Sequence, residues 1–184
     1  MADKAAFRRE ISRLEQSLTR EQRLESDRLL CWNFLNHPRV ARAETILLFA
    51  GMGLEVDTRP LLEQLEAAGK QLCLPRCLPG NAMEARRYDG ARLVRHRYGM
   101  LEPDLSCPVV DKTRIDLILV PALCYDRRCY RMGRGGGFYD RYLADYTGFT
   151  LGLCRQALLQ AAVPVERWDQ RVDAVLTERE QFGR

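Results

Sequence analysis

The chain has 184 residues, of which 46% are hydrophobic and 29% are charged, and both values are ordinary for a soluble globular protein. Its formal net charge of +4 comes from 29 basic and 25 acidic residues, an excess too mild to indicate a general nucleic-acid-binding surface. No apolar stretch reaches the ~18 residues that a membrane-spanning helix needs. We therefore expect one domain over residues 1–184, with small-molecule ligands rather than a nucleic acid or a membrane as partners.

Seven cysteines invite a disulfide or metal-site interpretation, but their spacings contain no CxxC pair, and only two histidines could supplement them. The count is odd, and we expect no signal peptide ahead of them. Both points favour reduced thiols in a cytoplasmic protein.

Two helices are predicted at the start of the chain. Residues 3–18 carry apolar side chains at helical spacing along one side. Thr19 begins a second helix, with Gln22 three residues later as its capping-box partner, and this helix ends before a His-Pro pair. Lys4 and Arg8 lie one turn apart on the first helix and share a face. From the residues alone, this pair indicates a solvated helix flank.

A strand, loop, helix and strand follow in that order. The apolar run 45–50 predicts a buried strand, and Thr58 is the expected N-cap of a helix that stops at Gly69. Residues 71–74 predict the next strand. This βα repeat favours a three-layer α/β/α fold with a mostly parallel sheet. Because ligands bind at the carboxyl ends of strands in such sheets, the loop 51–58 is a candidate binding segment.

The second half of the chain is less clear. Residues 83–88 and 92–95 are predicted as short strands around the Asp89-Gly90 turn, a hairpin signal. Apolar runs at 115–123, 150–154 and 172–177 are further strand candidates. Asp173 interrupts the last of these, and a buried strand aspartate is uncommon unless it is paired or metal-bound. A salt bridge and a metal ligand both stay open for it.

A glycine loop follows the 115–123 strand and is the most informative stretch. Three successive glycines allow backbone conformations with φ > 0, so that several N–H groups can converge on one phosphate. The residues after the loop predict a helix, whose N-terminus would also favour an anion. Asp140 lies in its first turn, and a carboxylate beside a phosphate suggests Mg²⁺ between them. The loop contains Gly135, Gly136 and Gly137 among Arg127, Arg128, Arg131 and Arg134.

This loop matches neither of two common phosphate motifs. It lacks the Lys-hydroxyl pair that ends a P-loop, and Phe138 occupies the last glycine position of a GxGxxG that begins at Gly133. A flexible basic surface loop is the alternative interpretation.

The segments VPALCYD and RMGRGGGFYDRYL resemble the signature of the 5-formyltetrahydrofolate cyclo-ligases, also called methenyltetrahydrofolate synthetases. Three weaker motifs occur in the same order as in that family: a KxxxR helix at Lys4 and Arg8, the loop MGLEVDT, and a terminal VD pair. Two positions depart from the family pattern. Phe138 replaces a usual Tyr, and Cys129 stands where Gly is common.

The resemblance implies a set of site residues. Arg134 is the implied catalytic residue, and Asp140 and Asp173 are the implied Mg²⁺ ligands. Implied contacts to folate are Met52, Glu55, Asp57 and residues Arg134, Gly135, Gly136, Gly137 and Phe138. Implied contacts to ATP are Lys4, Arg8, Arg131, Met132, Gly133, Arg134, Gly135, Gly136, Gly137, Phe138 and Tyr139. Tyr98 is either a loop anchor or an aromatic contact to substrate.

The activity that the resemblance implies is ATP- and Mg²⁺-dependent conversion of 5-formyltetrahydrofolate to 5,10-methenyltetrahydrofolate, with release of ADP and phosphate, by a cytoplasmic monomer. Two other classes stay open. One is a non-catalytic nucleotide- or RNA-binding protein that uses the same basic loop. The other is a sugar-phosphate isomerase or CoA-transferase relative, since that fold is shared and fold does not determine function.

Overall fold

The structure is a computed structural model that describes residues 3–97 and 99–183, so the predicted role of Tyr98 lies outside the described residues. Within them, eight strands form one sheet in the order β12-β11-β10-β7-β1-β2-β3-β6. The pairs that join β11, β10, β7, β1 and β2 are parallel, and the outer pairs are antiparallel. The prediction of a mostly parallel sheet is confirmed. The strand bounds are β1 (Thr45–Leu47), β2 (Gln71–Leu78), β3 (Ala82–Arg87), β6 (Val109–Val110), β7 (Leu117–Val120), β10 (Phe149–Leu153), β11 (Ala174–Leu176) and β12 (Gln181–Gly183).

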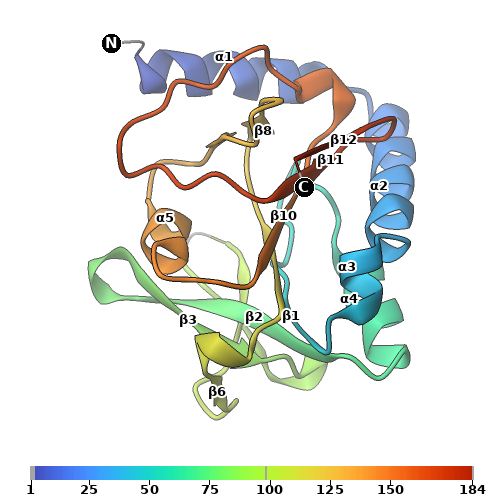
Figure 1. Cartoon of the computed structure of the whole chain (residues 1–184), viewed down its shortest axis with the longest axis vertical. Coiled ribbons are helices and arrows are strands. Elements are labelled where there is room, and N and C mark those ends of the chain that lie inside the picture. The colour runs from blue at the N-terminus through green and yellow to red at the C-terminus, as the bar shows by residue number, and fades with distance from the viewer. Residues whose placement is uncertain (1–2, 98, 184) are drawn as a thin grey trace.

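Helices cover both faces of this sheet (Figure 1). Side chains alternate along a strand, so Ile46 and Leu48 enter the core shared with α2, α3 and α4, whereas Leu47 enters the core shared with α1 and α5. The three-layer α/β/α prediction is therefore confirmed. No helix of the described residues is long and apolar enough to span a membrane. The helix bounds are α1 (Lys4–Ser17), α2 (Arg20–Leu35), α3 (Pro38–Arg42), α4 (Arg59–Ala67) and α5 (Phe138–Leu143).

Two predicted helix caps have different outcomes. The capping box of α2 is present: Thr19 accepts a hydrogen bond from the backbone of Gln22, and the Gln22 side chain accepts one from the Thr19 backbone. Thr58, by contrast, makes no side-chain cap at the start of α4. Its buried hydroxyl instead donates to the Phe49 carbonyl and accepts from the Gly51 N–H. The hydroxyl therefore closes the loop that follows β1.

The predicted hairpin around Asp89 is wrong, although both of its strands exist. β3 pairs with β2 and β6, while β4 (Leu93–Arg95) pairs with β5 (Leu101–Pro103). Asp89 caps a single 3₁₀ turn by accepting from the Ala91 N–H. The physical reason is burial: Met83 and Ala85 are 8% and 1% exposed, so β3 joins the main sheet, where these side chains leave water.

Candidate active site

A cavity of about 1140 Å³ opens at the carboxyl ends of three parallel strands. Phe49 follows β1, Pro75 and Cys77 lie in the second half of β2, and Pro121 follows β7, and all four line the cavity. The cavity thus lies where the βα pattern predicts a ligand site.

Most of the residues predicted from the sequence meet in this cavity. They come from α1, from the loop after β1, and from the stretch that runs from β9 (Arg131–Met132) into α5, segments that are far apart in the chain. Asp57 and Asp173 are the two predicted site residues that do not line it. Those that do are Lys4, Arg8, Met52, Glu55, Arg131, Met132, Gly133, Arg134, Gly135, Gly136, Gly137, Phe138, Tyr139 and Asp140.

The glycine loop begins from a small antiparallel hairpin formed by β8 (Cys124–Tyr125) and β9 (Arg131–Met132). Gly135 and Gly137 have φ angles of 101° and 65°, which residues with a Cβ rarely adopt. At Gly136, a Cβ would lie 2.7 Å from the Phe138 ring. A side chain at Gly135 or Gly137 would strain the backbone, and one at Gly136 would force the Phe138 ring to move. Because α5 has only six residues, the loop amides and the nearby arginines are better candidates for holding an anion than the helix dipole.

Arg131 and Asp140 hold each other in place at the base of the loop. The Arg131 side chain is only 5% exposed and donates to Asp140 Oδ1 at 2.7 Å. It also donates to the Gln170 carbonyl, while the Gln170 N–H donates to Asp140 Oδ1 at 3.0 Å. Arg131 therefore positions the Asp140 carboxylate, and among the described residues the hydrogen bonds to that carboxylate go to Oδ1.

Arg134 connects the glycine loop to the loop after β1. Its Nε lies 2.8 Å from Glu55 Oε1, and the Arg134 side chain is 52% exposed. Glu55 also accepts a hydrogen bond from the Met52 N–H at 3.0 Å. The predicted folate loop and the predicted phosphate loop thus lie next to each other across one ion pair.

The first helix contributes two cations to the cavity. Arg8 donates from Nε to the Gly133 carbonyl at 2.9 Å. The Lys4 ammonium lies 2.5 Å from Asp169 Oδ2 and 2.8 Å from Glu166 Oε2. Burial tends to lower the pKa of Lys4, but the hydrogen bonds to these two carboxylates outweigh it and raise the pKa. Lys4 and Arg8 therefore lie on the helix face that lines the cavity, and the interpretation of this pair as a solvated helix flank is wrong.

Asp57 and Asp173 have local partners instead. Asp57 forms an ion pair with Arg59 at 2.6 Å and accepts from the Arg59 N–H at the start of α4. These hydrogen bonds lower the pKa of Asp57. Asp173 Oδ2 accepts from the N–H and the hydroxyl of Thr150, both at 2.9 Å, beside the first half of β10. Their roles in folate and metal binding stay predictions.

The sequence reasoning missed several cavity residues. Arg141 donates to the carbonyls of Gly136 and Asn81, and its position one helical turn after Gly137 could have identified it. Glu102 was not missed in the same way, because the family resemblance places a Glu-Pro pair near the substrate; Glu102 is 3% exposed and lines the cavity. The segment 166–170 closes one side of the cavity, but it is a polar loop with no periodic signal.

Tyr139 lines the cavity and carries a buried donor. Its hydroxyl is buried and has no hydrogen-bond partner among the described residues. Burial raises the pKa of Tyr139, so the hydroxyl keeps its proton. A buried polar group without a partner is uncommon, and a ligand oxygen would satisfy it.

Comparison with known proteins identifies relatives over nearly the full length. The sequence model of the 5-formyltetrahydrofolate cyclo-ligase family matches residues 1–178. The 5-formyltetrahydrofolate cyclo-ligase of Escherichia coli (strain K12) is 33% identical over 174 residues, which cover 91% of this chain and 96% of that protein. The Mus musculus protein of the same name is 28% identical over 189 residues, which cover 95% and 93%. The NMR structure of Aquifex aeolicus 5,10-methenyltetrahydrofolate synthetase has a TM-score of 0.87 and 27% identity, and the match covers 98% of this chain and 92% of that chain.

Proposed function

The chain belongs to the 5-formyltetrahydrofolate cyclo-ligase family, and from this premise we propose that it converts 5-formyltetrahydrofolate and ATP to 5,10-methenyltetrahydrofolate, ADP and phosphate. The resemblance inferred from the sequence motifs is thereby confirmed. One observation carries the proposal. A single cavity joins an arginine-rich glycine loop, suited to phosphates, to the Met52–Glu55 loop, suited to a second substrate.

The reaction needs an activated oxygen, because a formyl oxygen is a poor leaving group. The γ-phosphoryl group of ATP transfers to the formyl oxygen, the N10 nitrogen then attacks the formyl carbon, and the carbon–oxygen bond breaks to release phosphate while N10 loses its proton. Phosphoryl transfer depends mainly on positioning and on charge stabilisation. These are the two things that the cavity residues supply.

The phosphate half of the cavity is cationic. The loop amides at Gly135–Gly137 and the Arg134 guanidinium bind the terminal phosphates, while Lys4 and Arg8 of α1 line the same cavity and Arg8 lies against the loop. Arg134 stabilises the charge that develops on the transferring group. The Tyr139 hydroxyl donates its unused proton to a ligand oxygen.

The folate half is formed by the loop after β1. Met52 packs against the flat pterin ring, and the Glu55 carboxylate accepts N–H donors from the ring edge. Because Glu55 also pairs with Arg134, the same contact aligns the folate with the phosphate donor. The resemblance implies Asp57 as a further folate contact.

A magnesium ion fits the donors on one side of this cavity. Asp140 is 24% exposed at the edge of the glycine loop, and with Oδ1 held by Arg131 its Oδ2 is the oxygen that would hold the ion. When bound, Mg²⁺ would neutralise phosphate charge. The resemblance implies Asp173 as a second ligand, a role that Asp173→Asn tests.

We also infer a cytoplasmic enzyme. All seven cysteines are free thiols in the structure, and six of them are buried. Reduced thiols in this number are typical of a reducing compartment.

The decisive experiment mixes the purified protein with MgATP and 5-formyltetrahydrofolate and follows the absorbance of methenyltetrahydrofolate. We expect product only when both substrates and the metal are present, with one ADP released for each product. Nucleotide binding without product would contradict the proposal.

A second experiment tests the metal ligand. Asp140→Asn should raise the Mg²⁺ concentration needed for half-maximal rate, and an unchanged metal titration would count against the role of Asp140 as a ligand.

A further inference from the structure

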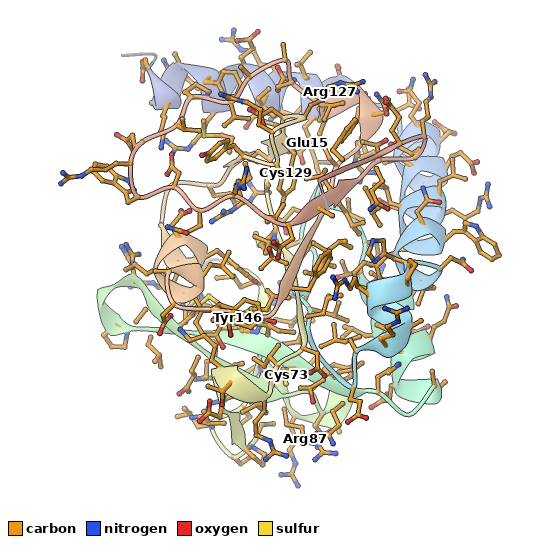
Figure 2. All side chains as sticks on the ribbon, in the orientation of Figure 1. Glu15, Cys73, Arg87, Arg127, Cys129 and Tyr146 are labelled. Atoms are coloured by element: carbon orange, nitrogen blue, oxygen red, sulfur yellow. The ribbon has the colours of Figure 1, made fainter. Side chains whose placement is uncertain are left out.

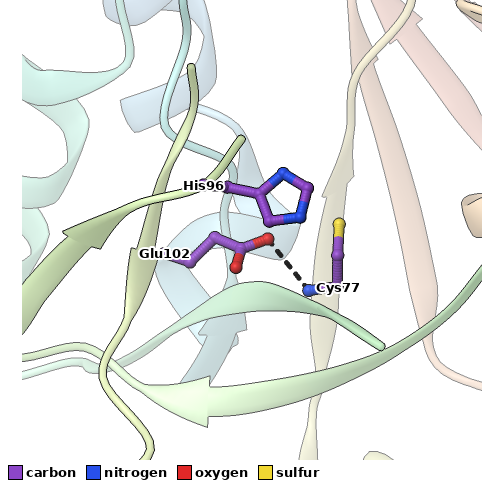
Figure 3. Close-up of side chains that lie close together, drawn as sticks. All are labelled: Cys77, His96 and Glu102. Carbon is purple, nitrogen blue, oxygen red and sulfur yellow. Dashed lines mark hydrogen bonds between the residues drawn. The ribbon is translucent and has the colours of Figure 1, made fainter. Parts of the chain in front are cut away.

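A second group of metal-type donors lies at the wall of the cavity, away from Asp140. Figure 3 shows the side chains of Cys77, His96 and Glu102 converging. One donor atom from each side chain lies within 4.8 Å of the other two. Cys77 belongs to β2 and Glu102 to β5, while His96 directly follows β4.

The backbone holds these three residues in register. The Cys77 N–H donates to Glu102 Oε1 at 2.9 Å, which ties β2 to β5. The turn between β4 and β5 is closed by two hydrogen bonds of 2.8 Å, from the His96 N–H to the Met100 carbonyl and from the Gly99 N–H to the His96 carbonyl. The donor set is therefore fixed by the sheet and by a hairpin turn, which reduces the cost of ordering it around an ion.

The burial of Glu102 also points to a cation. This residue is 3% exposed, and a carboxylate so far from water needs compensating partners. A divalent ion placed where the thiol and the imidazole meet the carboxylate would be such a partner, in addition to the Cys77 N–H that already donates to Glu102.

The donor types select the metal. A thiolate and an imidazole are poor ligands for Mg²⁺ and Ca²⁺, whereas Zn²⁺ accepts sulfur, nitrogen and oxygen donors together. Zinc–ligand distances of about 2.0–2.3 Å in a tetrahedron place donors about 3.5 Å apart. Donor atoms that already lie within 4.8 Å of one another need only small side-chain rotations to reach that geometry.

We propose that Cys77, His96 and Glu102 form a zinc site with three protein ligands. Cys77 and Glu102 both line the large cavity, so the fourth coordination position faces it and is open to water or to a donor atom of a bound molecule. This site goes beyond the proposed reaction, because the Mg²⁺ of that reaction is assigned to Asp140.

Zinc binds cysteine as the thiolate, so binding at Cys77 would release the thiol proton.

The test uses the full chain, freed of metal with a chelator, and Zn²⁺ alone without nucleotide or folate. We expect one Zn²⁺ per chain by competition with a chromogenic chelator, and a thiolate-to-metal charge-transfer band when Co²⁺ replaces Zn²⁺. Cys77→Ser and His96→Ala should each weaken zinc binding at least ~100-fold, because each removes a direct ligand. Cys77→Ser should also remove the band.

Two variants serve as matched controls. Cys107→Ser removes another buried thiol of the same region, and His37→Asn removes the other histidine but keeps an acceptor for the N-cap of α3. Both should bind zinc as the wild type does. Melting temperatures measured without zinc check that each variant is folded. Wild-type zinc affinity in both Cys77→Ser and His96→Ala, or an equal loss in Cys107→Ser, would overturn the assignment. Because ATP and folate are absent, the result is independent of the proposed reaction.

Discussion

Arg131 and Arg134 are three residues apart, yet the structure holds them in different ways. Arg131 is 5% exposed and donates to Asp140 and to the Gln170 carbonyl. Arg134 is 52% exposed and pairs with Glu55 through one nitrogen, so its other donors can reach a phosphate. At the scale of single residues, we predict that Arg131 is a positioning residue and that Arg134 contacts the reacting group.

Replacement of Arg134 tests these different roles of Arg131 and Arg134. Arg134→Ala should lower turnover at least ~100-fold, a loss typical of removing one charge contact to the transition state. The measurement is the rate of methenyltetrahydrofolate formation at saturating ATP and folate.

Arg127→Ala is the control for this variant. Arg127 pairs with Glu180 and stacks over the Phe182 ring, it does not line the cavity, and Figure 2 labels it far from α5. Its removal should leave turnover near the wild-type value. Near-normal activity in Arg134→Ala would contradict the catalytic assignment.

At the scale of elements, the loop between β1 and α4 depends on one hydroxyl. Thr58 is fully buried and bridges the Phe49 carbonyl and the Gly51 N–H, which draws the two ends of the loop together. Close packing adds a second constraint, since a Cβ on Gly51 would lie 2.1 Å from the Val56 carbonyl oxygen. The position of Met52 and Glu55 in the cavity follows from this closure.

Thr58→Val should disrupt the loop without changing the size of the side chain. Two backbone groups would lose their partner, which costs about 1–3 kcal/mol of unfolding free energy. We also expect a higher KM for the folate substrate, with a smaller change for ATP. Urea unfolding and steady-state kinetics measure the two effects.

Thr58→Ser keeps the hydroxyl and is the matched control. It should retain most of the stability and the folate KM of the wild type. Equal losses in the serine and valine variants would show that the methyl group, rather than the hydrogen bonds, holds the loop.

The elements could largely be predicted from the sequence, because local signals determine them. The capping box at Thr19 and Gln22 defines the start of α2, and the alternation of apolar residues identifies the buried strands. The pairing of β3 could not be predicted, since it depends on which apolar side chains the rest of the sheet can bury. The role of Thr58 was missed for a similar reason, because its two partners lie seven and nine residues earlier in the chain.

The site was predictable where it uses a compact motif. The glycine loop could be recognised from its composition. Lys4 and Arg8 could be assigned to the same site from their spacing together with the family resemblance. The Cys77, His96 and Glu102 group had no such signal, because three strands or turns bring these residues together from separate segments. The same holds for Asp169, whose contact with Lys4 spans 165 positions in the chain.

At the scale of the whole molecule, some acidic groups are stabilised poorly. Glu15 is 7% exposed, and Figure 2 shows it between α1 and the interior. Burial raises the pKa of Glu15, although Arg134 and Arg155 oppose the shift. A carboxyl whose pKa is higher in the folded than in the unfolded chain favours folding at low pH and opposes it when ionised.

Glu15→Gln should therefore raise the melting temperature at pH values above the folded pKa of Glu15, where the wild-type carboxyl is ionised. As the pH falls through the folded pKa toward the unfolded value of about 4.3, the wild-type carboxyl becomes protonated and the difference should shrink. Thermal unfolding between pH 4 and pH 8 measures it. Glu10→Gln, at an exposed position on α1, is the control and should show little change at any pH. A difference in melting temperature that grows toward low pH would contradict the argument.

The two edge strands of the main sheet are short. β6 has two residues and β12 has three, and each pairs antiparallel with its neighbour. Long unpaired strand edges recruit further chains by continuing the hydrogen-bond ladder. Edge strands this short present few consecutive unpaired N–H and C=O groups, so growth of the sheet into fibrils or strand-linked assemblies is disfavoured. This protection against strand-to-strand association does not depend on the modest net charge of the chain.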